Sequence, residues 1–312
     1  MRFPFNLPKE REFDVIGFGT NAVDFLIQVP EYPSFNSKIE LTDYKQAAGG
    51  EVATTLVGLQ RLGLKTSYAG RFGKDSAGEF GLKELVAEGV DVRFSETVEG
   101  ARTQIAFIII DERDGERTVI WNRDKKLCYS LDESPLEIGS VARILHLTPH
   151  DTEACVKLAR RAKLQNTVIS LDIDDTFEDL EELLPLVDIL ISSADFAEKL
   201  LGIKDKKDAL GEIAARFGCG IAGLTSGEAG SLIFSGGEFF ETEGFIVPGG
   251  CKDTTGAGDA FRTGFLYGVL NGESIEESAR IANAVAALKC RKVGARTALP
   301  NVAALEEIIH DN

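Results

Sequence analysis

The chain of 312 residues is 44% apolar and 27% charged, which is typical of a globular protein and excludes disordered, collagen-like and disulfide-scaffold classes. Its formal net charge of −16 opposes binding to nucleic acid or to an anionic membrane surface, and no basic patch offsets it. The five cysteines form no CxxC pair, so we expect buried thiols rather than a metal site. The sequence has neither a signal-peptide pattern nor an apolar run of roughly 18 residues, so we expect a cytoplasmic protein.

Short β-branched runs alternate with helical patterns through most of the chain. The expected strands are FDVIGFG, RILHL, TVISLDI, VDILIS and IAGLT, and the expected helices lie near 50–62, 76–88, 152–164, 194–201 and 206–217. This alternation predicts a largely parallel sheet with helices on both faces. No long linker or repeat interrupts it, so we expect one domain over residues 1–312.

Two segments, about 25–45 and 101–123, break this alternation. ARTQIAFIII and ERTVIWN flank DERDG, where Asp114 and Gly115 suit a tight turn, which predicts an antiparallel hairpin. The first segment lacks a helical period and carries two prolines. Together the segments predict a small sheet that projects as a lid. The alternative is an edge extension of the main sheet.

The stretch DTTGAGDAF, from Asp253 to Phe261, combines a glycine-rich turn with the start of a helix. Phe261, Phe265 and Val269 recur every four positions, which indicates a helix with one buried face. On that helix Gly264 and Gly268 share a face, where the absence of side chains would let another element approach closely.

A helix start exposes unpaired N–H groups and the positive end of the helix dipole, so it favours an anion such as a phosphoryl group. Gly256, Ala257 and Gly258 leave room for that anion, and Asp259 in the first turn could take a proton from a hydroxyl that attacks it. The stretch lacks the GKS/GKT ending of a Walker A loop and the GxGxxG pattern of a dinucleotide fold.

A purely structural interpretation of the same stretch stays open. In it, Thr254 or Thr255 caps the helix, Asp259 only favours the helix dipole, and the glycines only form the turn. The turn taken alone does not distinguish a phosphate site from this alternative, because short glycine-rich motifs match by chance.

DTTGAGDAF followed by GFL resembles the second signature of the ribokinase-like carbohydrate kinases, the PfkB family. The resemblance continues, in order and spacing, through VIGFGTNAVD, AAGGEVATTLVGLQRLG, AGRFGKDSAGE with GVDV, TSGEAG and VGARTALP. It implies a three-layer α/β/α fold with a mostly parallel central sheet and a small β-sheet lid. It also implies an ATP-dependent kinase acting on a hydroxyl of a sugar or sugar-like molecule. A nucleoside or sugar-phosphate kinase, or an inactive sugar- or nucleotide-binding regulatory protein, are the alternatives.

The resemblance assigns roles to particular residues. Asp259 corresponds to the catalytic base, and the backbone of Gly256, Ala257 and Gly258 to the anion hole for the transferred phosphoryl group. The residues implied in substrate binding are Asp24, Gly49, Gly50 and the neighbouring Thr54; those implied near ATP are Thr225, Gly227 and Asn283. Many members bind a monovalent cation such as K⁺, here implied at Asp253, Thr255 and carbonyls near Gly294, and Mg²⁺ is expected with ATP.

Four positions depart from the family pattern; at one of them, Thr263, a smaller residue is usual and we expect little effect. Thr54 stands where asparagine is usual, which leaves the substrate open. Ser193 and Phe196 stand at the Asn and Glu of an Asn-x-x-Glu motif that helps organise Mg²⁺. Since Phe196 cannot bind a metal, either another acid such as Asp195 substitutes, or ATP itself holds most of the metal.

The lid segments match the part of these kinases that closes over the sugar and often pairs between subunits. We expect lid closure to exclude water from the transferred phosphate. Because a lid sheet has edges that need covering, we also expect a homodimer through the lid. Arg102, Arg117 and Arg123 could reach an acidic group on a substrate, or could simply be solvated lid charges.

Overall fold

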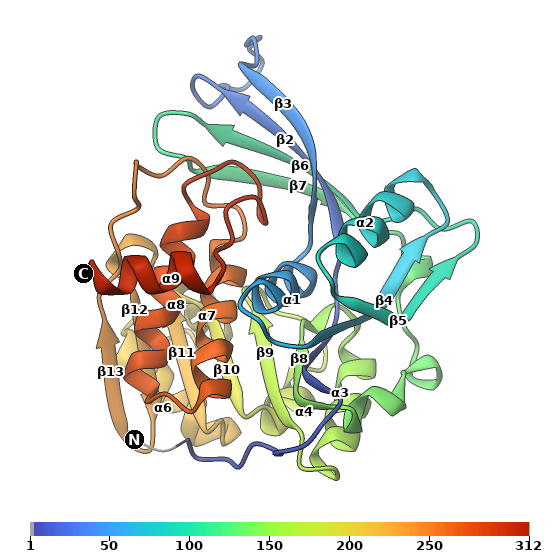
Figure 1. The fold of residues 1–312 in the computed structure, drawn as a ribbon, viewed down its shortest axis with the longest axis vertical. Helices are drawn as coiled ribbons and strands as arrows, with labels where there is room; N and C mark the ends of the chain where they lie inside the picture. Colours follow the sequence, from blue (N-terminus) through green and yellow to red (C-terminus); the bar gives the residue numbers. More distant parts are fainter. Residues whose placement is uncertain (1–2, 312) are drawn as a thin grey trace.

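The computed structural model describes residues 3–311 and is built around a nine-stranded sheet (Figure 1). The strand order is β13-β12-β11-β10-β9-β8-β1-β4-β5. In chain order the strands are β1 (Phe13–Phe18), β4 (Thr66–Gly73), β5 (Asp91–Val98), β8 (Ala142–Leu147), β9 (Val168–Ile173), β10 (Ile189–Ser193), β11 (Ile221–Thr225), β12 (Ser231–Ser235) and β13 (Glu238–Thr242). All neighbours are parallel except β11–β12 and β12–β13.

Helices cover both faces of this sheet, as the alternating pattern predicts. They are α1 (Glu51–Arg61), α2 (Ser76–Ala87), α3 (Thr152–Lys163), α4 (Leu180–Leu183), α5 (Ala194–Leu201), α6 (Lys206–Phe217), α7 (Ala257–Asn271), α8 (Ile275–Lys289) and α9 (Val302–His310). Val15 packs into the core under α1, α7 and α8, while its neighbour Ile16 packs into the core under α3 and α6. This alternation explains why the central strands are apolar on both sides.

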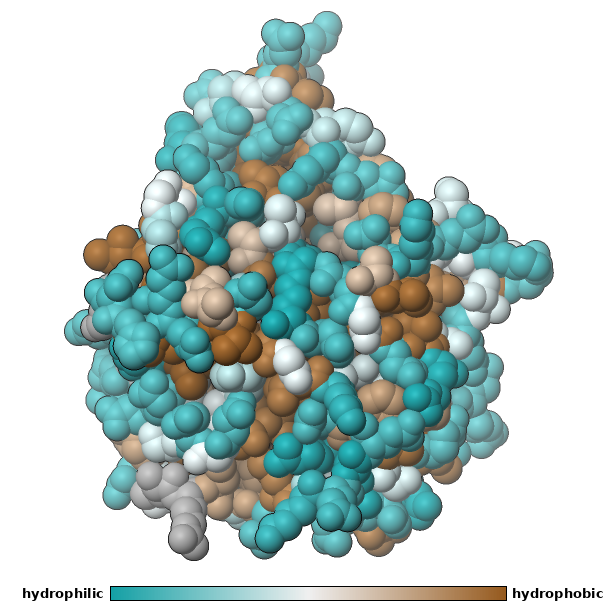
Figure 2. Space-filling view, viewed as in Figure 1, coloured by the Kyte–Doolittle hydropathy of each residue, from teal (hydrophilic) through white to brown (hydrophobic). Residues whose placement is uncertain are grey.

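The lid is a separate four-stranded sheet, ordered β3-β2-β6-β7, that projects from the body (Figures 1 and 2). Its strands are β2 (Ala22–Val29), β3 (Asp43–Gly49), β6 (Ile105–Asp111) and β7 (Arg117–Asn122). β6 and β7 form the expected antiparallel hairpin, with Gly115 at a φ of 77° in the turn. The edge-extension alternative is therefore wrong. Figure 2 shows mainly hydrophilic residues on the projecting tip.

Four strands of the main sheet were not predicted from the sequence. β4 and β5 contain glycine or several charged residues, and β12 and β13 form a short antiparallel hairpin at the sheet edge. Their β-structure depends on pairing with neighbouring strands rather than on local periodicity. Within residues 3–311, no helix is both long enough and apolar enough to cross a membrane.

The helix that follows the glycine-rich turn packs tightly against the next helix. A Cβ atom on Gly264 would lie 2.6 Å from Cα of Ala282, and one on Gly268 would lie 2.6 Å from the Ser278 hydroxyl oxygen. These two glycines therefore allow α8 to approach α7, as predicted. α8 in turn begins with a side-chain cap, because the Ser274 hydroxyl accepts a hydrogen bond from the Glu277 N–H.

Candidate active site

Two cavities adjoin at the start of α7. The larger, of about 580 Å³, lies between the lid and the carboxyl ends of the central strands and is called here the acceptor cavity. The smaller, of about 270 Å³, lies beside β11 and α8 and is called the nucleotide cavity. Arg117, Thr225 and Gly258 line both. Ligands in the two cavities would therefore meet beside the glycine-rich turn.

The glycine-rich turn leaves the start of α7 without a side-chain cap. Gly256 is the N-cap residue, with a φ of 77°, and no side chain accepts a hydrogen bond from the first turn. Instead, the Thr254 hydroxyl accepts a hydrogen bond of 2.9 Å from Arg117. The cap by Thr254 or Thr255 in the structural alternative is thus not formed. The Ala257 N–H donates a hydrogen bond of 3.0 Å to the Thr254 carbonyl, so the N–H groups of Gly256 and Gly258 are the ones that this turn can offer to an anion.

Asp259 lies in the first turn of α7 and lines the acceptor cavity. Burial raises the pKa of its carboxyl to about 7; Arg262 opposes this rise, while Glu51 and Asp174 add to it. A carboxyl with a pKa near neutrality is better matched to accepting a proton from a hydroxyl than an ordinary aspartate is.

Asp24 reaches the same cavity from the lid. It lies on β2, is almost fully buried, and burial raises the pKa of its carboxyl to about 7 against the opposing charge of Arg296. Its carboxylate packs against Gly49, where a Cβ atom would overlap the carboxylate oxygens. Gly50 has a φ of 91° and lines the cavity at the start of α1. The structure therefore brings Asp24 and both glycines together.

Thr54 lies behind this site rather than at the cavity wall. It is fully buried, and its hydroxyl oxygen lies 3.4 Å from the Arg296 Nε that donates to it. Arg296 also donates to the carbonyl of Gly49. Arg296 is thus a positioning residue that sequence reasoning missed, although it belongs to the quoted VGARTALP motif.

Several further acids line the acceptor cavity. Asp172, Asp174 and Asp175 follow or end the buried strand β9, at the edge where open α/β sheets bind ligands. Asp172 forms a buried ion pair of 2.5 Å with Arg262, which also donates to the Ile191 carbonyl. The run LDIDD at a strand end was the available signal for these acids.

The residues at the positions of the family's Asn-x-x-Glu motif have different surroundings in the structure. Ser193 lines the acceptor cavity, Phe196 is buried in the core, and Asp195 lines neither cavity. Within residues 3–311 no cluster of three His, Cys, Asp or Glu side chains is arranged to hold a metal ion. Asp195 is therefore not placed at either cavity to substitute for the missing Glu, whereas Asp174 lines the acceptor cavity.

The expected nucleotide residues line the nucleotide cavity. Thr225 ends β11, Gly227 follows it with a φ of 57°, and Asn283 reaches the cavity from α8. The Asn283 amide donates to the Ser231 hydroxyl and to the carbonyls of Thr242 and Glu243. Asn283 therefore holds the β12–β13 hairpin against α8 at the cavity wall.

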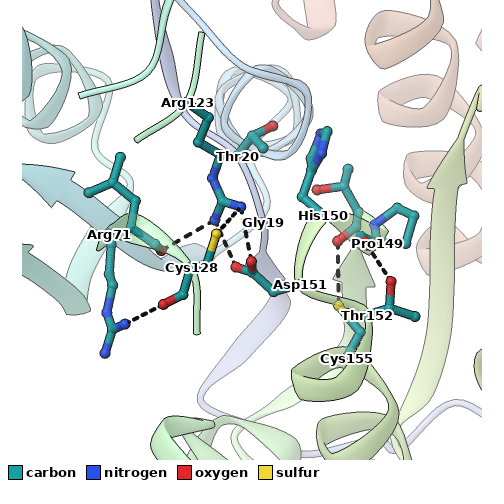
Figure 3. Close-up of polar contacts among 12 residues, drawn as sticks. Gly19, Thr20, Arg71, Arg123, Cys128, Pro149, His150, Asp151, Thr152 and Cys155 are labelled. Carbon is teal, nitrogen blue, oxygen red and sulfur yellow. Dashed lines mark hydrogen bonds and ion pairs between the residues drawn. The ribbon is translucent and has the colours of Figure 1, made fainter. Parts of the chain in front are cut away.

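The three lid arginines have different surroundings. Arg117 lines both cavities. Arg123 forms a two-pronged ion pair with Asp151, with N–O distances of 2.9 and 2.7 Å, and also donates to the Cys128 sulfur (Figure 3). Arg102 lines neither cavity. Arg117 is thus the one of the three that is placed to contact a ligand, and Arg123 braces the base of the lid.

The residues expected to hold a monovalent cation are brought together but already have partners. The Asp253 carboxylate accepts hydrogen bonds of 2.7 Å from the N–H groups of Thr255 and Gly294. The amine of Lys289 lies 3.8 Å from one of its oxygens. The Thr255 hydroxyl, by contrast, is buried without a partner among the described residues.

Comparison with known proteins agrees with this geometry. A model of the pfkB family carbohydrate kinases matches residues 14–302. A sugar kinase of Archaeoglobus fulgidus, described as uncharacterized, is 32% identical over 78% of this chain and 98% of its own length. A nucleoside kinase of Methanothermobacter thermautotrophicus is 26% identical over 92% of this chain and 93% of its own.

The fold is shared with solved structures. The ribokinase of Giardia lamblia superposes with a TM-score of 0.85 at 20% identity, covering 96% of this chain and 100% of its own. At 20% identity this similarity shows only that the two proteins share the three-layer fold. The family match over residues 14–302 covers both cavities, the lid and the turn at Gly256, and the chain therefore belongs to the PfkB family of carbohydrate kinases.

Proposed function

We propose that this kinase transfers the γ-phosphoryl group of ATP to a hydroxyl of a neutral sugar or sugar-like molecule. The observation that carries the proposal is the meeting of the acceptor and nucleotide cavities at Gly258, one residue before Asp259. A hydroxyl in one cavity and a triphosphate in the other would face each other across the uncapped start of α7. Such positioning accounts for much of the catalysis of phosphoryl transfer.

In the proposed reaction Asp259 accepts the proton of the acceptor hydroxyl. The hydroxyl oxygen forms a bond to the γ-phosphorus, the bond from that phosphorus to the bridging oxygen breaks, and ADP leaves with the electron pair. The N–H groups of Gly256 and Gly258 hold the transferred group as its charge redistributes, and that of Ala257 joins them once it leaves the Thr254 carbonyl. Arg117 lies at the junction of the cavities and adds a positive charge there.

ATP and Mg²⁺ fit the residues present. Mg²⁺ bound with ATP supplies charge compensation between the β- and γ-phosphates. The acids of the acceptor cavity include Asp172, one carboxylate oxygen of which is buried without a hydrogen-bond partner. That oxygen and the nearby Asp174 are the groups that would face the metal or its water ligands.

The charges of the acceptor cavity favour a neutral acceptor over a sugar phosphate. Six carboxylates line the cavity against three permanently charged cations. The acids are Asp24, Glu51, Asp172, Asp174, Asp175 and Asp259, and the cations are Arg117, Lys199 and Arg262. Arg262 is already paired with Asp172, and Lys199 with Asp175. Asp24 and Asp259 are partly protonated near pH 7, but a second phosphate in this cavity would still find only Arg117 among the lining Lys and Arg residues without an acidic partner.

A nucleoside is the second acceptor class that an observation supports. Trp121, His150 and Phe177 line the acceptor cavity, and their rings meet edge to face with centroids 6.0 and 5.2 Å apart. Aromatic surface of this kind could stack against a base or cover the apolar face of a sugar ring. The acceptor panel below separates these two classes.

The test is ATP turnover, with Mg²⁺ present, across free sugars, sugar phosphates, sugar acids and nucleosides, for the wild type and for Asp259→Asn. We expect turnover with a neutral acceptor and a kcat about 10²- to 10⁴-fold lower in the variant, because the positioned base is lost. Unchanged turnover in pure Asp259→Asn would rule out this role for Asp259. Ligand binding with ATP consumption at the blank rate for every acceptor would instead favour a regulatory binding protein.

We also propose that the protein is a homodimer that pairs through the lid. The lid sheet carries exposed apolar side chains that do not line the acceptor cavity, including Phe107, Ile120 and Tyr44. Phe107 stacks on Phe25 from the neighbouring strand, with ring centroids 5.1 Å apart. An apolar face with open strand edges on either side is the kind of surface that a second copy covers.

A further inference from the structure

Within residues 3–311 one lysine is completely buried, and it lies directly behind the glycine-rich turn. Lys289 ends α8, and its side chain has no exposed surface. Its amine donates a hydrogen bond of 2.6 Å to the backbone carbonyl of Asp253 and lies 3.8 Å from the Asp253 carboxylate. A buried ammonium is costly unless it is paired, so this placement requires a negative partner. Asp253 is that partner.

Asp253 connects Lys289 to the two backbone segments that form the turn. Its carboxylate accepts the N–H groups of Thr255 and Gly294. The segment after Gly294 backs the anion-binding turn, because a Cβ atom on Gly256 would lie 2.8 Å from the Ala295 Cβ. The charge of Lys289 therefore acts on the turn through Asp253, without contact with a ligand.

Most of the oxygens that would otherwise hold a free monovalent cation already accept hydrogen bonds from amines or backbone N–H groups. The Lys289 amine donates to the carbonyl of Asp253 and lies 3.8 Å from its carboxylate, whose two oxygens already accept the N–H groups of Thr255 and Gly294. The carbonyl of Val293, next to Gly294, accepts a hydrogen bond of 2.5 Å from the amine of Lys45 on lid strand β3. Among the side-chain oxygens of Asp253 and Thr255, only the Thr255 hydroxyl lacks a partner. The site therefore does not fit K⁺.

We propose that the Lys289 ammonium is a built-in cation that replaces a bound monovalent ion, so that phosphoryl transfer proceeds without added K⁺. The inference rests on the proposed kinase function. Lys289 is a positioning residue: it fixes positive charge behind the N–H groups of the turn, where charge redistributes during transfer. A charge held in place within the fold needs no reorganisation during the reaction. An ammonium is also a compact charge, as an alkali cation is.

The first test uses the wild-type enzyme with its best acceptor. Turnover is measured at constant ionic strength in tetramethylammonium chloride, which is too large for the site, and in KCl. We expect kcat and KM to agree within about twofold between the two salts. A kcat that rises more than about tenfold in KCl would overturn the proposal, since a change of 1.4 kcal/mol corresponds to that factor.

The second test compares two neutral substitutions that differ in volume. Lys289→Ala leaves space for an ion, whereas Lys289→Met fills it. In the tetramethylammonium salt we expect kcat to fall at least about tenfold in both, with little change in the KM of the acceptor. Adding K⁺ should restore much of the kcat of Lys289→Ala and little of that of Lys289→Met. Wild-type kcat in both folded variants would contradict the proposed role.

A control variant and a second measurement distinguish failure of this inference from failure of the proposed kinase function on which it rests. Lys252→Met removes an exposed positive charge beside Asp253 and should leave kcat and its salt response unchanged. Thermal unfolding in the two salts gives a readout that needs no turnover. We expect K⁺ to stabilise Lys289→Ala selectively, and neither the wild type nor Lys289→Met. If no acceptor is phosphorylated, the kinase proposal fails, while K⁺ binding by the wild type in this assay would separately refute the built-in cation.

Discussion

At the scale of single residues, Asp24 and Asp259 are the most informative. Both are ordinary aspartates in the sequence, and burial raises the pKa of each to about 7. The glycine-rich motif is what singles out Asp259 as the proposed base, because a helix start with small residues suits a phosphoryl group. Neither pKa shift could be predicted, since each depends on side chains that are far apart in the sequence, such as Arg296 near Asp24.

The raised pKa of Asp259 leads to a pH prediction. A base must be ionised to accept a proton, so kcat/KM should rise with pH through about 7 and level off above it. The measurement is kcat/KM from pH 5.5 to 9 at saturating Mg²⁺ and ATP. The same rise should remain in Asp24→Asn, which removes the second group that titrates near 7. A profile that is flat between pH 5.5 and 8 in the wild type would contradict the assignment.

The raised pKa of Asp24 leads to a stability prediction. Its carboxyl ionises near its ordinary pKa in the unfolded chain but near 7 in the folded chain, so the folded state binds more protons between these values. The free energy of unfolding therefore falls as pH rises through this range. Asp24→Asn should gain stability relative to the wild type as pH rises, by roughly 2 kcal/mol more at pH 8 than at pH 5.

Urea unfolding of both proteins at the two pH values measures this difference. Asp14→Asn, at a half-buried position outside both cavities, is the control for a general effect of removing an acid. If the stability difference between Asp24→Asn and the wild type is the same at pH 5 and pH 8, ionisation of the Asp24 carboxyl does not destabilise the folded state, and the prediction is wrong.

At the scale of elements, the start of α7 depends on the conformation of Gly256. Replacing it by alanine forces a side chain into a φ of 77° and places its Cβ 2.8 Å from the Ala295 Cβ. We expect Gly256→Ala to lower stability by about 1 to 2 kcal/mol and kcat by about 10²-fold, because the N–H groups shift relative to the phosphoryl group.

Gly272→Ala is the matched control at the other end of the same helix. Gly272 has a φ of 78°, but no atom lies within 4 Å of the place that an added Cβ would take. It should show a similar loss of stability in thermal unfolding while keeping the wild-type kcat. Equal kcat in the two variants would mean that the turn geometry at Gly256 does not matter to catalysis.

The lid offers a direct readout of acceptor binding. Trp121 is the only tryptophan of the chain, lines the acceptor cavity from β7, and has 56% of its surface exposed. We expect an acceptor to bury this indole, so its emission should shift to shorter wavelength and saturate with the acceptor concentration. Emission that is unchanged at saturating acceptor would show that the lid does not cover the ligand at this position.

At the scale of the whole molecule, the order of the main elements followed from the alternation of β-branched runs and helical patterns. The lid was predicted from the two segments, about 25–45 and 101–123, in which this alternation is absent. The unpredicted strands β4, β5, β12 and β13 are stabilised by their neighbours in the sheet. Lys289 could not be recognised either, because a lysine in the last turn of a helix usually faces solvent near the negative end of the helix dipole.

The assembly of the molecule is open to a direct test. If the lid face forms the subunit interface, the wild type should sediment at twice the chain mass, and Phe107→Lys should sediment as a monomer because a charge would be buried in an apolar interface. Val86→Lys changes a comparably exposed apolar residue on α2 and should remain dimeric. A wild type that is monomeric at micromolar concentration would exclude the lid dimer.

The position of Asp24 on β2 has a consequence for how specificity can change. The acceptor cavity takes Asp24, Ile108 and Trp121 from the lid sheet, whereas Asp259 comes from α7 in the body. In the proposed reaction, recognition of the acceptor therefore involves the lid sheet, whereas the transfer step depends on α7. Substitutions in the lid strands can therefore change which acceptor binds without changing the residues of α7 that carry out the transfer. We expect exchange of lid strands between related kinases to alter acceptor specificity.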